Sequence, residues 1–195
     1  MFRMKSSQTN SECSQPDARR DFEIRPVEKF PESEFSQLQR QVFADVQRES
    51  DELNALLRAE GETGAAEPAH APMFRLGAYI GEELVGWSNG WMERGRVFYM
   101  ANSGVVAAHR RKGVYTALLS AVRDHALSQG AVTLRSQHSV LNNAVIITKL
   151  RFGFHVSGLS QSAQMGTLVE LSHHLSQPRQ EMFRGRAIPF VARPT

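Results

Sequence analysis

The sequence is short of cysteine and of long apolar runs. Its one cysteine, Cys13, lies in a polar stretch near the start of the chain. There is therefore neither a disulfide framework nor a thiol placed to act as a nucleophile. No run approaches the ~20 apolar residues that a membrane-spanning helix needs, and the first residues lack the apolar segment of a secretory signal. We therefore expect no membrane partner and a cytoplasmic location.

A strongly basic folded body is also lacking, although the sequence pI is near 9.3. Residues 1–20 carry a net charge of +2 and residues 172–195 carry +3; since the whole chain carries +3, residues 21–171 sum to −2. No interleaving of arginines with aromatic residues marks a surface that would read bases. Nucleic acid is therefore an unlikely partner, and a nucleic-acid binder that acts through its basic tails is the minor hypothesis.

The composition favours one folded domain between two tails. With 195 residues, 41% of them hydrophobic, the chain is long enough to bury a full core. Residues 1–20 are polar and have almost nothing to bury, so we expect a disordered leader. We expect a single domain over residues 21–171 and a basic C-terminal extension over 172–195.

The stretch at 105–128 organises the rest of the chain. The apolar end of a strand is followed by a basic loop, and from Tyr115 onward apolar residues recur at helical spacing up to Ala126. A helix that begins at Gly113 leaves its first backbone N–H groups without intrahelical acceptors, and its dipole adds positive charge there. The pattern predicts a cradle for a phosphate or pyrophosphate. A solvated turn between strand and helix is the alternative interpretation.

Periodicity and turn residues predict an alternation of strands and helices around this stretch. The strand after the central helix should run parallel to the strand before it, because a helix returns the chain to the same end of the sheet. We expect strands at 22–25, 74–80, 84–92, 97–106, 131–136, 154–159 and 167–171, and helices at 31–46, 50–61, 113–128 and 141–152.

Two segments resemble motifs of the GNAT superfamily of N-acetyltransferases. Arg110-x-x-Gly113-x-Tyr115 is similar to the acyl-CoA-binding motif, with Tyr115 where the family has a small residue. The segment from Asn142 to Phe154, with Gly153-Phe154 at its end, is similar to the second motif. The resemblance implies an α/β (α+β) fold: a mixed, mostly antiparallel sheet of about seven strands, a parallel pair at the cofactor cleft and about four flanking helices.

The resemblance also implies the acyl donor, acetyl-CoA, and the part of the chain that holds it. The pantetheine arm would pair with the main chain at the end of the strand before the loop, and the pyrophosphate would lie on the loop and helix start, with Arg110 supporting the loop. For Asn142 and Asn143, helix capping is an equal alternative. The residues assigned to the cofactor are Val105, Val106, Arg110, Arg111, Lys112, Gly113, Val114, Tyr115, Thr116, Asn142 and Asn143.

Proton transfer is where the sequence departs most from the family. The resemblance would place a tyrosine, which protonates the departing thiolate, at the position of Lys149. Tyr115, Ser139 or solvent are the alternative proton donors. The backbone N–H near Val106 would polarise the thioester carbonyl.

The strand at 97–105 contains no carboxylate to act as a base. His138, at the end of a strand facing the cleft, has a side chain whose ordinary pKa suits proton transfer near neutrality; a structural histidine is the alternative. Glu93 lies at a turn, where we expect solvent around it. His173 and His174 are neighbours on one strand and would face opposite ways, without cysteine or aspartate partners, so we assign no metal.

These expectations combine into an acetyl-CoA-dependent N-acetyltransferase that acts on a primary amine of a small-molecule or amino-acid-like acceptor. A non-catalytic acyl-CoA- or CoA-binding module is the alternative, because the tyrosine and the strand carboxylate are missing. The acceptor cannot be identified from the sequence, and whether the protein forms a homodimer stays open.

Overall fold

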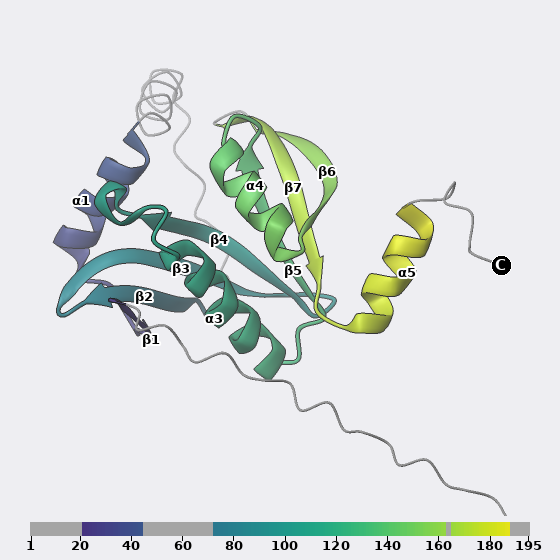
Figure 1. Cartoon of the computed structure of the whole chain (residues 1–195), viewed down its shortest axis with the longest axis horizontal. Coiled ribbons are helices and arrows are strands. Elements are labelled where there is room, and N and C mark those ends of the chain that lie inside the picture. Colours follow the sequence, from purple (N-terminus) through teal and green to yellow (C-terminus); the bar gives the residue numbers. More distant parts are fainter. Residues whose placement is uncertain (1–20, 45–71, 163–164, 188–195) are drawn as a thin grey trace, which may run out of the picture.

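The computed structural model describes residues 21–44, 72–162 and 165–187 (Figure 1). The predicted leader at 1–20 and the predicted helix at 50–61 lie outside the described residues. Seven strands form one sheet in the order β1-β2-β3-β4-β5-β7-β6. The strands are β1 (Glu23–Pro26), β2 (Phe74–Ile80), β3 (Glu83–Glu93), β4 (Val97–Val105), β5 (Thr133–Ser139), β6 (His155–Ser162) and β7 (Gly166–His174). The helices are α1 (Glu32–Val42), α3 (Val114–Ser128), α4 (Asn143–Phe152) and α5 (Gln177–Ala187), with a short 3₁₀ turn at Ala107–His109.

The sheet is mixed, as the sequence predicts. Only β4 and β5 pair in parallel, and the other five strand pairs are antiparallel. The parallel arrangement follows from α3, which carries the chain from the end of β4 back to the start of β5. The seven-stranded mixed sheet with one parallel pair and flanking helices therefore confirms the predicted fold class.

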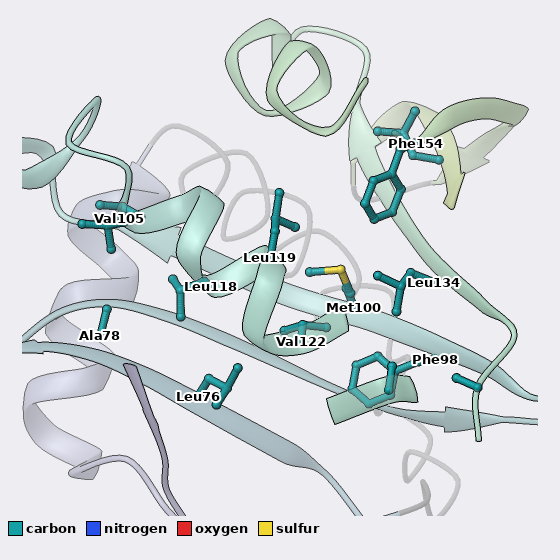
Figure 2. Packing of buried hydrophobic residues seen from close by; sticks show 14 of the residues in the cluster. Leu76, Ala78, Phe98, Met100, Val105, Leu118, Leu119, Val122, Leu134 and Phe154 are labelled. Carbon is teal, nitrogen blue, oxygen red and sulfur yellow. The ribbon is translucent and has the colours of Figure 1, made fainter. Parts of the chain in front are cut away.

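The main core lies between the sheet and the central helix. Leu118, Leu119 and Val122 on α3 are at most 1% exposed, and they pack in one cluster with Phe98 and Met100 from β4 (Figure 2). Fully burying a side chain of this size contributes about 1.5–3 kcal/mol. This packing fixes the position of α3, and with it the position of the helix N-terminus.

A second core lies on the opposite face of the sheet, under α1. Successive residues of a strand point to opposite faces. Gly86 lies against Val114 of α3, whereas Trp87, which is fully buried, packs edge-on against Phe35 of α1. A Cβ on Gly104 would lie 2.6 Å from the Trp87 ring, so only glycine fits there. The two helices therefore clamp the β3–β4 half of the sheet from both sides.

β4 and β5 separate after a short stretch of pairing. Their partners are Val97 to Tyr99 on β4 and Thr133 to Arg135 on β5, and no further pairs follow. On the other side of β4, the register with β3 shifts so that Ala101 opposes no residue, which is a β-bulge. A bulge bends its strand and increases its twist. The strands therefore diverge toward the C-terminal end of β4, as Figure 1 shows.

The C-terminal region differs from the expectation. The last strand continues to His174, three residues beyond the predicted end at 171, and a helix that the sequence analysis did not predict follows it. This helix, α5, is strongly polar, so it has no apolar periodicity that would predict it. An aromatic contact holds it against the sheet: the Phe183 ring stacks on His155 of β6 with the ring centroids 3.7 Å apart.

Candidate active site

The loop after β4 is held by one of its own arginines. Arg110 Nε donates to the Val105 carbonyl oxygen over 3.0 Å, which ties the loop back to the strand end. Arg111 has φ of 63° and Gly113 has φ of 82°, so both lie in the left-handed region that favours glycine. Arg110 is thus placed to support the loop, and the turn into α3 depends on the glycine at 113.

The N-terminus of α3 offers free backbone donors. Ala117 N–H is the first to bond within the helix, to the Gly113 carbonyl oxygen over 3.0 Å. This leaves the N–H groups of Val114, Tyr115 and Thr116, and no side chain among the described residues caps them. Nothing lies within 4 Å of where a Cβ on Gly113 would stand. Together with the positive end of the helix dipole, this open approach fits an anion such as a pyrophosphate.

Two exposed cations flank the same helix start. The side chains of Arg111 and Lys112 are exposed, as is Thr116 on the first turn, whereas Val114 is 2% exposed and packs into the core. Positive side chains at a helix N-terminus oppose the helix dipole unless an anion lies between them. This local arrangement of charge is therefore unfavourable by itself, and an anion at the helix start would make it favourable.

The backbone at the end of β4 corrects one expectation. Val106 N–H donates to the Val85 carbonyl oxygen over 3.0 Å, and the Val106 carbonyl oxygen accepts from His109 N–H over 2.9 Å. The Val106 N–H is therefore not available to polarise a thioester carbonyl. Residue pairs in an antiparallel ladder alternate between hydrogen-bonded and non-hydrogen-bonded. Val105 lies opposite Gly86 in the next, non-bonded pair, so its N–H points away from β3 and toward the gap between β4 and β5. Val105 is the better candidate for that role.

Lys149 of α4 lies where β4 and β5 part. The side chain is 1% exposed. Its Nζ donates to Ser136 Oγ over 2.6 Å and lies 3.7 Å from Met100 Sδ. Burial lowers the pKa of this amine to about 7, because a low-dielectric interior disfavours the charged form. A lysine among the apolar residues of α4 was visible in the sequence, but its burial depends on how α4 packs on the sheet.

His138 shares this buried polar cluster. Its Nε2 lies 3.2 Å from Ser136 Oγ. Burial, with a smaller contribution from the neighbouring Lys149, lowers the His138 pKa to about 3. An imidazole that binds a proton so weakly is a poor general base near neutral pH. His138 thus lies beside Ser136 near the separation of β4 and β5, and its lowered pKa argues against the role of a general base.

Tyr115 points into the protein rather than toward a ligand. Its ring packs against the main core, and its hydroxyl is buried without a hydrogen-bond partner. Burial raises the Tyr115 pKa above its ordinary value. A phenol with a raised pKa is a weaker acid, so this geometry argues against Tyr115 as the donor of a proton to a thiolate.

The remaining candidates lie in the turn between β5 and α4. Ser139 Oγ accepts from Leu141 N–H over 3.3 Å, which stabilises the turn. The Asn142 side chain accepts from Val145 N–H over 3.4 Å and caps α4, so helix capping, the alternative interpretation, is what the structure shows for Asn142. Asn143 is exposed at the first position of the helix.

A polar cluster lies on the opposite face of the β4–β5 junction, and the sequence analysis missed most of it. Tyr99, paired with Arg135 across the two strands, donates from its hydroxyl to Gln137 Oε1 over 3.3 Å. Gln137 Nε2 in turn donates to Glu170 Oε1 over 2.9 Å. Arg135 forms an ion pair with Glu93 at 2.8 Å. Glu93 was expected to be solvated, whereas this contact leaves its side chain 28% exposed.

The described residues contain no group of three or more His, Cys, Asp or Glu side chains that could hold a metal ion. His173 Nδ1 lies 2.8 Å from the Gly153 carbonyl oxygen. His174 Nδ1 lies 3.3 Å from Thr133 Oγ1. None of the helices in the described ranges combines the length and the apolar character needed to span a membrane.

Comparisons with known proteins agree with this fold. The model of the acetyltransferase (GNAT) family matches residues 30–154. The ribosomal-protein-S18-alanine N-acetyltransferase from Escherichia coli is 13% identical, with a TM-score of 0.59 over 80% of this chain and 95% of that chain. Aminoglycoside 6'-acetyltransferase type Ii is 15% identical, with a TM-score of 0.59 over 78% of this chain and 97% of that chain. Ard1 from Thermoplasma volcanium is 16% identical, with a TM-score of 0.58 over 80% of this chain and 99% of that chain. No curated protein sequence matches the chain significantly.

The parallel strands separate beside the uncapped start of α3, and the fold is that of an acyltransferase. The chain belongs to the acetyltransferase (GNAT) family, whose model matches more than half of its length. This confirms the resemblance seen in the two sequence motifs. The family uses acetyl-CoA as the acyl donor.

Proposed function

We propose that the protein binds acetyl-CoA between β4 and β5 and transfers the acetyl group to a primary amine of a small-molecule or amino-acid-like acceptor. One observation carries the proposal. β4 loses its parallel partner after Tyr99, and the uncapped start of α3 lies only a short loop beyond the end of the same strand. A ligand with an anionic end and a hydrogen-bonding arm fits both features at once.

The cofactor would lie along the open edge of β4. The pantetheine amides have the donors and acceptors to pair with the main chain there, at Val105 in particular. The pyrophosphate would take the backbone N–H groups of Val114, Tyr115 and Thr116, together with the charges of Arg111 and Lys112. Arg110 acts through the loop, because its guanidinium already binds the Val105 carbonyl oxygen.

The acceptor would approach from the face opposite α3. That face carries Glu93, whose charge Arg135 balances in an ion pair, and Glu170, which accepts from Gln137 beside the Tyr99 hydroxyl. The cluster therefore keeps one unbalanced carboxylate, which favours an acceptor that carries positive charge. Such an amine has to lose a proton before it attacks the thioester carbonyl. An acidic group on the approach path therefore supports a cationic amine rather than a carboxylate-rich acceptor.

A turnover screen tests this function. The protein would be mixed with acetyl-CoA and a panel of amines, amino acids and amino-terminal peptides. Thiol release would be followed in solution, and the acetylated product would be identified by mass spectrometry. We expect thiol release that requires both substrates and favours cationic primary amines. Saturable acetyl-CoA binding without an acetylated product from any amine would contradict the proposal and support the non-catalytic CoA-binding module.

A further inference from the structure

Lys149 fills the closed end of the gap between the two parallel strands. The last paired residues are Tyr99 on β4 and Arg135 on β5. Met100 and Ser136 are the next residues along the two strands, and the Lys149 Nζ contacts both. It lies 3.7 Å from Met100 Sδ and 2.6 Å from Ser136 Oγ. The amine therefore lies where the strands begin to separate, which is where the proposed cofactor site ends.

The surroundings of this amine give it no counter-charge. Ser136 Oγ is its oxygen acceptor, and the Phe154 ring lies under it with the centroid 4.9 Å from Nζ. In the described part of the chain, no carboxylate forms an ion pair or hydrogen bond with it. A buried charge without a partner is costly, and an apolar side chain of similar size would fill the space at lower cost. A lysine here needs a reason other than packing.

The neighbouring titratable groups are histidines and an arginine. His138 on β5 shares Ser136 with Lys149. On β7, the His173 ring stacks on Phe154, with the centroids 5.3 Å apart. On α3, the guanidinium of Arg123 lies over the Phe152 ring. None of these groups carries negative charge, so nothing in this shell opposes the depression of the Lys149 pKa to about 7 by burial. The amine thus exchanges a proton near neutral pH.

We propose that Lys149 donates the proton that the sulfur of coenzyme A takes up when the acetyl group leaves. The proposal rests on the proposed acetyl-CoA site. The acceptor nitrogen attacks the thioester carbonyl carbon, and a C–N bond forms. When the tetrahedral adduct collapses, the C–S bond breaks and its electron pair goes to sulfur. The Lys149 ammonium protonates that sulfur, while the proton of the acceptor nitrogen goes to solvent, so the products are an amide and a neutral thiol.

Ser136 and His138 supply the return path for the proton. While Lys149 is charged, its Nζ donates to Ser136 Oγ. Once the amine is neutral, the Ser136 hydroxyl can turn to donate to Nζ, and His138 Nε2, 3.2 Å from Ser136 Oγ, can donate its proton to that oxygen. Lys149 is buried, whereas His138 is only partly buried. After each turnover a proton can pass from solvent through His138 and Ser136 to the neutral amine. His138 acts here as a link in the chain rather than as a base.

Two substitutions of Lys149 test the proposal. Lys149→Met keeps the length and apolar packing of the side chain but removes the proton, and Lys149→Gln keeps a hydrogen bond to Ser136 without a titrating group. With acetyl-CoA and amine saturating, we expect kcat to fall roughly 10²-fold or more in both variants. The Kd for acetyl-CoA, measured by calorimetry, should change less than about threefold. Lys29→Met, at an exposed lysine, is the matched control and should keep the wild-type kcat.

The pH profile separates proton donation from a structural role. In the wild type, kcat should fall as pH rises above about 7, because Lys149 then loses its proton; both variants should lack this alkaline limb. A kcat within about threefold of wild type in either folded variant would overturn the proposal, as would a wild-type profile without the limb. Loss of acetyl-CoA binding in both variants would make Lys149 a binding residue instead. If the wild type itself bound no acetyl-CoA, the proposed function would fail before this question arose.

Discussion

A lysine buried without a counter-charge should make the stability of the fold depend on pH in a defined window. The pKa of Lys149 is lowered by burial from an ordinary 10.5 to about 7. Between these values the unfolded chain binds one more proton at this site than the folded chain does. Stability therefore rises with pH through the window, with a slope of about 1.4 kcal/mol per pH unit. Below the folded pKa the slope vanishes, because both states are then protonated and the destabilisation by the buried amine is complete.

The interval from pH 8 to 9 isolates this contribution. The histidines with lowered pKa values, among them His138 and His173, stop contributing above their ordinary pKa of about 6.5. The tyrosines with raised pKa values, Tyr99 and Tyr115, begin to destabilise the fold only near pH 10, where the unfolded phenols ionise. A chain of 195 residues gains about 2–4 °C in Tm per kcal/mol. The expected rise in Tm from pH 8 to 9 is therefore about 3–5 °C.

Thermal unfolding followed by circular dichroism at pH 8, 8.5 and 9 measures this rise. Lys149→Met should abolish it and should raise the Tm most at the lower pH values, where holding the Lys149 amine neutral in the fold costs most relative to the protonated amine of the unfolded chain. Lys29→Met, at a lysine exposed to solvent, should keep the wild-type slope. A wild-type Tm that is flat across the interval, or an equal slope in Lys149→Met, would refute the inference that Lys149 is buried and unpaired.

Three further predictions follow from the site and the tails. Gly113→Glu should weaken acetyl-CoA binding at least tenfold by calorimetry, because it places a carboxylate where the pyrophosphate would bind. Gly95→Glu is the control, since Gly95 also has a positive φ and open space around it, and it should keep the wild-type affinity. A Gly113→Glu variant with the wild-type affinity would refute the anion site. Tyr115→Phe should leave kcat within about threefold of wild type. It should leave the Tm unchanged or raise it, because the Tyr115 hydroxyl is buried without a hydrogen-bond partner. A drop of about 10²-fold in kcat would instead support Tyr115 as the proton donor. Deletion of residues 1–20 should leave the Tm and the acetyl-CoA affinity unchanged, since their composition offers little to bury; a drop of several degrees would show that the leader docks on the domain.

Local signals in the sequence were sufficient to predict the fold and the position of the loop and helix start at Gly113. The apolar strand end, the basic loop and the helical spacing after Gly113 lie within one continuous stretch, so no long-range contact had to be guessed. The parallel pair followed from the helix between its strands. Asn142 shows the limit of such signals: a capping residue and a ligand-binding residue look alike in sequence, and only the hydrogen bond to Val145 N–H separates them.

The side-chain contacts around Lys149, where β4 and β5 separate, could not be predicted from spacing in the sequence. Lys149 and Ser136 are on different elements, and their contact depends on how α4 packs on β5. The pairing of Val106 with Val85 depends on the register between β4 and β3, so sequence spacing placed the N–H only near Val106 and did not separate Val106 from Val105. The direction of Tyr115 depended on the rotation of α3 about its axis. The fold and the helix start after the loop were thus predictable, whereas the contacts around Lys149 were not.

The central claim is that acetyl-CoA lies between β4 and β5 with its pyrophosphate on the start of α3. A crystal structure of the protein with coenzyme A tests it most directly. The account predicts phosphate oxygens within hydrogen-bond distance of the Val114 to Thr116 N–H groups, the pantetheine arm along the open edge of β4, and the sulfur close to Lys149 Nζ. The claim would be contradicted by coenzyme A bound elsewhere on the chain. It would also be contradicted if crystals grown at saturating coenzyme A showed no ligand between β4 and β5.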